Sequence, residues 1–235
     1  MGVFVLTGAG VSAESGLGTF RDAGGIWAEF DPMTLATPEA FARDPVTVHA
    51  FYNARRRNLI AAQPNAAHFA LADLARGTEV FLCTQNIDDL HEQAGSPQAH
   101  HMHGELLKAL CGRCGATHPW REDLSLLDAC ANCGRAGALR PDVVWFGEMP
   151  YGLEAIEAAL EAADLFVAIG TSGAVYPAAG YVDLARRLGI PRVEINLDPS
   201  DNARAFDDRR YGPATEEVPR FVADLLGRSA RREGA

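Results

Sequence analysis

The N-terminal strand and the glycine-rich turn that follows it constrain the fold of this chain more than any other stretch. Val3–Leu6 is a short run of apolar β-formers that leads into Gly8-Ala9-Gly10-Val11-Ser12-Ala13-Glu14. A buried strand, a glycine turn and a helix N-terminus together let backbone N–H groups approach a phosphate closely. Gly8, Gly10 and Ala13 also match the spacing of the dinucleotide fingerprint. Tight packing alone would favour the same small residues, so both interpretations stay open at this point.

The residues after this turn depart from an ordinary dehydrogenase. A dehydrogenase continues through a helix into a second strand that ends in Asp or Glu about 20 residues on. This chain continues instead with Gly18-Thr19-Phe20-Arg21-Asp22 and reaches Trp27 without a second strand. We therefore expect a nucleotide that is bound, but not in the dehydrogenase manner.

Short apolar strands alternate with helices along most of the chain. Strands are expected at 3–6, 80–84, 142–146, 165–169 and 192–196, and helices at 38–62 (two), 66–75, 153–163, 178–188 and 216–226. This alternation predicts an α/β fold with a Rossmann-like, doubly wound parallel sheet. Ligands bind such sheets beyond the strand C-terminal ends, and polar clusters follow four of these strands. The clusters are residues 8–21, 85–88, 170–172 and 196–198.

Two segments interrupt this pattern. We expect a Rossmann-like NAD-binding domain made of residues 1–34, 77–104 and 140–235. An inserted helical module would span 35–76, and a small zinc-ribbon module would span 105–139, where Cys, His and Gly replace the helix and strand periods. The charged tail after Gly227 is expected to fray.

Composition narrows the class of protein. Apolar residues make up 48% and charged residues 22% of the 235 residues, as in a soluble globular protein. The net charge of −10 argues against nucleic-acid binding and mildly suits lysine-rich peptide partners. No apolar run reaches membrane-spanning length, and no signal peptide is recognisable. We expect a cytoplasmic monomer without nucleic-acid or membrane partners.

Four of the five cysteines form two Cys-x-x-Cys pairs, Cys111 with Cys114 and Cys130 with Cys133. Fifteen residues separate the pairs, which fits a tetrahedral structural zinc site in a reducing compartment. Such a site has no open position for water, so the metal would hold shape. The alternatives are a redox pair or a metal-free ribbon. Cys83 lies in an apolar run and is expected to be a buried small hydrophobe.

His103 is the candidate proton acceptor. His100, His101 and His103 are too closely spaced, and lack the carboxylate pattern, for a typical metal site. A lone histidine in a loop is often structural. His103-Gly104, however, precedes the zinc module, where a cleft between two domains is expected. The ordinary pKa of histidine suits proton transfer near neutral pH.

Taken together, these motifs resemble the sirtuin family of NAD-dependent protein-lysine deacylases, and most closely its bacterial branch that acts on acidic acyl groups. They occur in the family's order and cover nearly the whole chain. The motifs are Gly8-Ala9-Gly10-Val11-Ser12 with Gly16 and Phe20-Arg21; Thr84-Gln85-Asn86-Ile87-Asp88; His103-Gly104; the four cysteines; Arg140–Glu148; Gly170-Thr171-Ser172; and Glu194-Ile195-Asn196.

The resemblance implies NAD as cofactor and one structural zinc. His103, Asn86 and Asp88 would be catalytic, with His103 taking a proton from a ribose hydroxyl of NAD. The acyl group would move from lysine to ADP-ribose as nicotinamide leaves. The implied cofactor contacts are Gly8, Ala9, Gly10, Ser12, Ala13, Glu14, Phe20, Arg21, Trp27, Gln85, Asn86, Ile87, Asp88, Gly170, Thr171, Ser172, Asn196, Leu197, Asp198 and Ala214.

The resemblance also implies the side on which an acyl-lysine protein or peptide binds. Val144 and Phe146 would line the lysine tunnel, and the strand around Trp145, Gly147 and Glu148 would pair with the peptide backbone. Tyr52 and Arg55, three residues apart on one helix face, would receive the distal carboxylate of succinyl- or malonyl-lysine. A solvated helix face is the simpler alternative, because Arg55, Arg56 and Arg57 form a run.

Two other functions compete with deacylation. An ADP-ribosyltransferase could use the same NAD pocket and would leave label from NAD on protein. A non-catalytic binding module would show no turnover.

Overall fold

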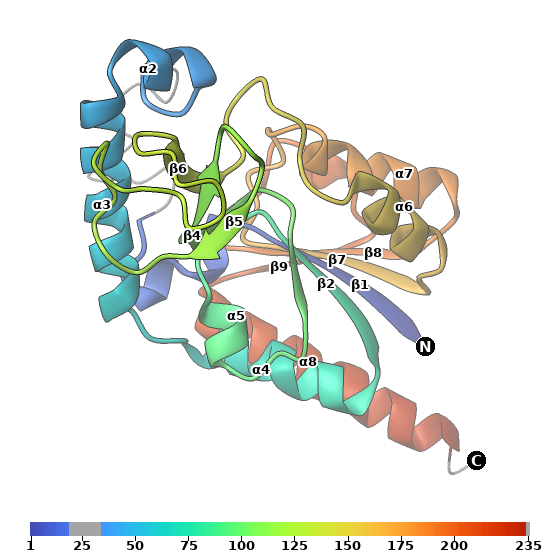
Figure 1. Ribbon diagram of the computed structural model, residues 1–235. Coiled ribbons are helices and arrows are strands. Elements are labelled where there is room, and N and C mark those ends of the chain that lie inside the picture. The colour runs from blue at the N-terminus through green and yellow to red at the C-terminus, as the bar shows by residue number, and fades with distance from the viewer. Residues whose placement is uncertain (19–33, 234–235) are drawn as a thin grey trace.

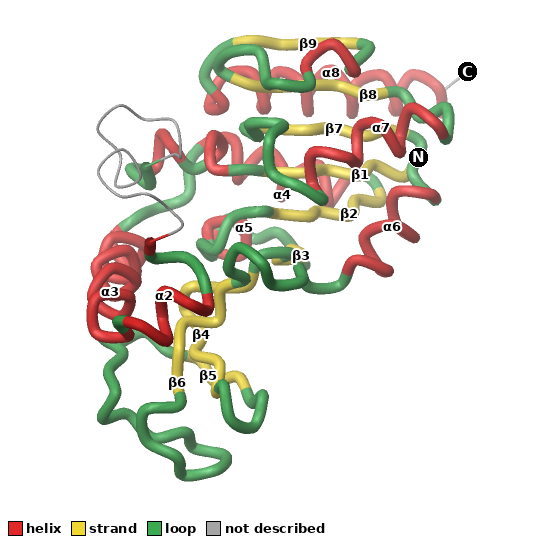
Figure 2. The backbone as a smooth tube through the Cα atoms, turned by 90° about the horizontal axis from the view of Figure 1, so that it is seen from above, coloured by secondary structure: helices red, strands yellow, loops and turns green. Residues whose placement is uncertain are grey.

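A six-stranded parallel sheet organises the protein (Figures 1 and 2), whose computed structural model describes residues 1–18 and 34–233. The strand order is β3-β2-β1-β7-β8-β9, and every neighbouring pair is parallel. The predicted Rossmann-like fold class is therefore confirmed. The strands are β1 (Gly2–Thr7), β2 (Glu79–Thr84), β3 (Ala99–His101), β7 (Leu165–Ile169), β8 (Arg192–Asn196) and β9 (Asp208–Tyr211).

Helices cover both faces of this sheet (Figure 1). One face carries α4 (Ala66–Gly77), α5 (Leu90–Gln93) and α8 (Ala214–Glu233), and the other carries α6 (Leu153–Glu161) and α7 (Tyr181–Arg187). Successive side chains of a strand point to opposite faces, so the buried strand β1 feeds two cores. Val3 and Val5 pack with Leu71 and Phe221, whereas Phe4 and Leu6 belong to the core of the other face. Short 3-10 helices span Ala9–Val11, Ala13–Ser15, Ala178–Gly180 and Ala203–Ala205.

A second, smaller unit lies at the end of the sheet where the parallel strands terminate (Figure 2). It contains α2 (Pro38–Arg43), α3 (Pro45–Ala61) and an antiparallel sheet of order β5-β4-β6. These strands are β4 (Gly104–Cys111), β5 (Thr117–Pro119) and β6 (Leu139–Val143). Helix α3 begins as the sequence predicts, because Asp44 Oδ1 accepts from Thr47 N at 3.1 Å and Pro45 occupies the first turn.

Several details of the sequence-based prediction are wrong. The strand expected at 142–146 is β6, which ends at Val143 and pairs with β4 rather than with the main sheet. Pairing of Cys111 with Leu139 places β6 beside β4, the strand that ends at the first of the four cysteines. Strands β3, β4, β5 and β9 were not predicted. Helix α8 continues through the segment expected to fray, and the helix expected at 178–188 is divided into a 3-10 turn and α7.

The division into residues 1–34, 77–104 and 140–235, with modules at 35–76 and 105–139, stays a prediction. Within the described ranges, no helix combines the length and the apolar character needed to cross a bilayer.

Candidate active site

The glycine turn after β1 interlocks with the turn after β7. Gly8 N donates to Ile169 O, and Gly10 N donates to Gly170 O, both at 2.9 Å. A Cβ atom on Gly10 would lie 2.7 Å from the Cα of Gly170, so a larger residue does not fit. The chain then continues as two 3-10 turns rather than the expected α-helix N-terminus. Close loop packing thus accounts for both glycines, whichever ligand binds here.

The predicted polar clusters meet at this edge of the sheet. Gly170 N donates to Ile195 O at 2.9 Å, and Asn196 Nδ2 donates to Thr171 O at 2.8 Å, which ties residues 170–172 to 196–198. The first turn of helix α8, which begins at Ala214, contacts the segment after the glycine turn, because Thr215 N donates to Glu14 Oε2 at 3.0 Å. The carboxylate of Glu14 therefore contacts the start of α8.

A buried hydrogen-bond network lies behind the turn. The Ser12 hydroxyl donates to Asp88 Oδ2 at 3.0 Å and accepts from Asn86 Nδ2 at 3.1 Å. His68 Nδ1 accepts the backbone N–H of Asn65 at 3.2 Å, so the proton of its neutral ring lies on Nε2, which donates to Ser12 Oγ over 3.3 Å. The network holds Asn86 and Asp88 in fixed positions beside the glycine turn.

Burial sets the charge state of this network. It lowers the pKa of His68 to about 4, so the ring is neutral near pH 7. Burial also raises the pKa of Asp88, against the hydrogen bonds from Leu90 N and Ser12 that lower it. Sequence reasoning missed His68, which is three residues after the helix cap Asn65 and far from Ser12 in the chain. Its one signal was a histidine in the apolar first half of this helix.

His103 is held with one ring nitrogen committed. Its Nδ1 lies 3.0 Å from Gln85 O, and a carbonyl oxygen only accepts, so Nδ1 carries the proton and Nε2 keeps its lone pair. Burial lowers the pKa of His103, which keeps the ring neutral near pH 7. Val144 N donates to His103 O at 2.9 Å. The histidine thus joins the segment around Gln85 to the one that starts at Val144.

Tyr52 and Arg55 face the same region from α3. The Tyr52 hydroxyl is buried and accepts the indole N–H of Trp145 at 2.9 Å. The Arg55 Cζ lies 5.6 Å from the centroid of the Phe51 ring. Burial lowers the pKa of Arg55, while the charges of Tyr52 and Asp88 oppose that shift. Arg55 therefore lies within electrostatic range of both the tyrosine and the Asp88 carboxylate.

Residues 144–148 form an anchored turn rather than the expected strand. Glu148 N donates to Trp145 O at 3.0 Å, and Gly147 adopts a φ of 90°. The Glu148 carboxylate accepts both Arg140 Nη1 and Nη2 at 2.8 Å, and Phe146 N donates to Ala36 O at 2.9 Å. Phe146 is 43% exposed, which leaves it available to a ligand.

The four cysteines come together at the base of the small sheet. Their Sγ atoms all lie within 4.8 Å of one another, as four thiolate ligands of one zinc ion would. Cys111 and Cys130 are buried and Cys114 and Cys133 are exposed, next to a small core of Ala109, Leu124 and Leu139. The donor set fits the predicted structural zinc.

Comparison with known proteins identifies the family. The family described as "SIR2: Sir2 family" matches residues 8–177. The chain belongs to the Sir2 family. It is 60% identical to the "NAD-dependent protein deacylase" of Caulobacter vibrioides, over 97% of this chain and 98% of that protein.

Solved sirtuin structures share the fold. A "Sir2 homolog-NAD complex" is 41% identical, with a TM-score of 0.87 over 96% of this chain and 90% of that one. A Sir2 protein solved with a "deacetylated p53 peptide" and "3'-o-acetyl ADP ribose" is 28% identical, with a TM-score of 0.81 over 95% of this chain and 93% of that one. The NAD-binding fold that sirtuins share is thus present in nearly the whole chain.

Three predicted sirtuin cofactor contacts, Phe20, Arg21 and Trp27, lie outside the described residues. The other predicted contacts belong to segments that follow the strand ends of the main sheet, and their role in binding NAD stays a prediction. Leu197 is the most exposed hydrophobic residue among them, at 65%.

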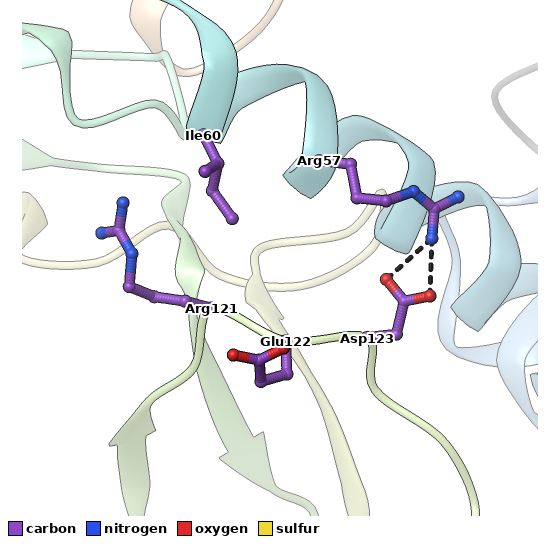
Figure 3. Close-up of a pocket in the computed structure, with 5 residues that line it drawn as sticks. All are labelled: Arg57, Ile60, Arg121, Glu122 and Asp123. Atoms are coloured by element: carbon purple, nitrogen blue, oxygen red, sulfur yellow. Dashed lines mark hydrogen bonds and ion pairs between the residues drawn. The ribbon is translucent and has the colours of Figure 1, made fainter.

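One hollow of the described surface contains none of these residues. It lies on the outer side of α3, where Arg57 Nη1 contacts Asp123 Oδ1 at 2.7 Å (Figure 3). The lining residues are Arg57, Ile60, Arg121, Glu122 and Asp123. Because it is open and shares no residue with the sirtuin motifs, we assign no chemistry to it.

Proposed function

We propose that this sirtuin removes acidic acyl groups, succinyl and malonyl, as well as acetyl from protein lysines. The acyl group leaves the lysine amide for a hydroxyl of ADP-ribose, nicotinamide leaves the sugar carbon, and one water is consumed as the free lysine amine is released. Family membership and the deacylase relatives establish the broader class, an NAD-dependent protein deacylase. The preference for acidic acyl groups rests on one observation, the placement of Tyr52 and Arg55 three residues apart on one face of α3.

The residues of the chain divide the reaction between them. NAD supplies the sugar carbon that is attacked and the acceptor of the acyl group. His103 accepts a proton from a ribose hydroxyl through Nε2, because Nδ1 is committed to Gln85 O. Asn86 and Asp88, held by Ser12, orient the nicotinamide side of the nucleotide.

The acyl pocket complements a carboxylate. The Arg55 guanidinium provides charge and the Tyr52 hydroxyl provides a hydrogen-bond donor. Burial raises the pKa of Tyr52 to about 12, so the hydroxyl keeps its proton near pH 7. A succinyl or malonyl carboxylate would be neutralised there, whereas an acetyl group has no carboxylate that the two side chains could bind.

Partner and location are part of the same proposal. The substrates are acyl-lysine proteins or peptides, which meet the exposed Phe146 and the turn it belongs to. A site of four thiolates suits a reducing compartment, so we place a monomeric enzyme in the cytoplasm.

The test compares acetyl and succinyl versions of one lysine peptide with NAD, following nicotinamide release. We expect release with both peptides and a higher kcat/KM for the succinyl peptide. Release that does not depend on the acyl group would contradict deacylation, and label from NAD that stays on protein would indicate an ADP-ribosyltransferase. A succinyl peptide that reacts more slowly than the acetyl one would contradict the acyl preference alone.

A further inference from the structure

Among the residues that the structure describes, the Tyr52 hydroxyl has one hydrogen-bond partner, the indole of Trp145, and this bond limits where the phenol proton can point. Trp145 Nε1 lies 2.9 Å from the Tyr52 oxygen. An indole N–H can only donate, so the tyrosine oxygen is the acceptor of this bond. Within the described part of the chain, no residue accepts the Tyr52 O–H proton. The Tyr52 hydroxyl therefore accepts from the indole, and its own proton points away from Trp145 and can be donated to another group.

The indole that sets this orientation is itself fixed from several sides. The Trp145 side chain is 2% exposed. The Arg140 Cζ stacks 3.9 Å from the centroid of its ring, and Arg140 is held in turn by both oxygens of Glu148. The backbone N–H of Trp145 donates to Glu148 Oε2 at 2.8 Å, and the Phe41 ring packs at 5.3 Å between centroids. The ring has little freedom to rotate its N–H away from Tyr52.

Tyr52 and Trp145 come from different parts of the smaller unit. Tyr52 lies in α3, and Trp145 follows β6, 93 residues later. The bond therefore links the helix that carries the acyl-selecting pair to the turn that meets the peptide. A tyrosine with no such bond could rotate its hydroxyl among several acceptors, including water, and would lose entropy on binding a carboxylate.

We propose that Trp145 is a positioning residue for acyl selection, whose indole N–H occupies the Tyr52 oxygen and directs the phenol proton to the carboxylate of an acidic acyl-lysine. This inference rests on the proposed function of Tyr52 and Arg55. It adds a residue that acts through Tyr52 and does not contact the carboxylate itself.

A double-mutant cycle tests the assignment. Trp145→Phe removes the N–H and keeps an aromatic ring for Arg140. The readout is the ratio of kcat/KM for a succinyl peptide to kcat/KM for the matching acetyl peptide. We expect Trp145→Phe to lower this ratio roughly three- to tenfold, the range of one net hydrogen bond. In a Tyr52→Phe background, the same change should alter the ratio by less than about twofold.

Trp120→Phe is the matched control, because the buried Nε1 of Trp120 makes no hydrogen bond within the described residues. It should leave the acyl ratio unchanged. If Trp145→Phe does not fold, judged by zinc content and thermal unfolding, Trp145 can be replaced by benzothienylalanine, which exchanges the N–H for sulfur within the same ring shape.

Three results would overturn the inference. The first is that Trp145→Phe lowers kcat/KM equally for the acetyl and succinyl peptides. The second is that Trp145→Phe lowers the ratio as much in the Tyr52→Phe background as in the wild-type background. The third is a wild-type ratio that does not respond to Tyr52→Phe or Arg55→Met, which would refute the proposed acyl preference as well. A ratio that responds to those two changes but not to Trp145→Phe would refute the role of Trp145 alone.

Discussion

The two sides of the active site are built by different means. The sheet edge uses backbone and short buried side chains, with Gly10 against Gly170 and Ser12 between Asn86 and Asp88. The acyl side uses long side chains from two elements of the smaller unit, with Tyr52 bonded to Trp145. The positions of the sheet-edge groups are fixed by the hydrogen-bonded parallel strands that precede them. The positions of the acyl-side groups depend on how α3 packs against the segment that follows β6.

This difference assigns separate tasks to the two sides. Groups at the sheet edge contact the nucleotide that every reaction uses, so their loss should affect all acyl groups alike. Groups on the acyl side meet the part of the substrate that varies, so their loss should change the ratio between acyl groups. Each experiment below challenges that separation.

Removing zinc should have the largest effect, because it destroys the smaller unit as a whole. The loop at Leu124 is bound on both backbone groups by Asn53 of α3, at 2.8 and 2.9 Å. Without zinc, no metal–sulfur bonds hold the four cysteines together, and small zinc modules unfold when those bonds are lost. We expect chelation to abolish deacylation of both peptides while far-UV circular dichroism retains the signal of the main sheet and its helices. Zinc should restore activity, and a zinc-free protein with full activity would contradict the assignment.

His103→Ala should reduce deacylation by about 10²–10⁴-fold, the usual contribution of a general base. The loss should be the same for acetyl and succinyl peptides, since the proton comes from the nucleotide. His100→Gln is a suitable control, because His100 lies in β3 and contacts Tyr151 O rather than the site. Steady-state kinetics on both peptides measure the loss, and the zinc content shows whether the variant is still folded. A loss confined to one peptide would break the separation of tasks.

The sequence predicted the sheet-edge residues better than the contacts between them. Buried parallel strands read as continuous apolar runs, so β1, β2 and β7 were recognisable, whereas β8 was recognisable from the β-branched Val193 and Ile195. The short polar edge strands β3 and β9 lack that signal, since Asp208–Tyr211 reads Asp-Arg-Arg-Tyr. β6 was assigned to the wrong sheet, because an apolar run does not say which partner it pairs with.

The candidate site shows the same limit. The cysteine spacing was sufficient to predict four clustered thiolates, because ligand spacing is local. The bond from His68 to Ser12 and the bond from Trp145 to Tyr52 join residues 56 and 93 positions apart. Such contacts depend on tertiary packing, which no local pattern encodes.

Arg55→Met should separate the two peptides. Methionine keeps most of the side-chain length without the charge, so the succinyl carboxylate loses a charge-assisted hydrogen bond. That bond is worth about 1.5–3 kcal/mol, so kcat/KM for the succinyl peptide should fall roughly ten- to a hundredfold. The acetyl peptide should change much less. Equal losses on both peptides would mean that Arg55 only supports the fold.

The pH dependence of kcat/KM should show the smallest effect, and this effect should come from the sheet-edge side of the site alone. Deacylation needs neutral His103, and burial holds its pKa below the ordinary value of 6.5. Activity should therefore fall only as the pH drops below 6.5, with a loss of less than about twofold at pH 6.5 itself. A succinyl carboxyl, with a pKa near that of Glu at about 4.3, stays ionised over the same range. The acidic limb of kcat/KM should then be identical for both peptides and unchanged in Arg55→Met, because it reports the sheet-edge side alone. A limb that differs between the peptides, or that lies above pH 6.5, would show that the two sides titrate together.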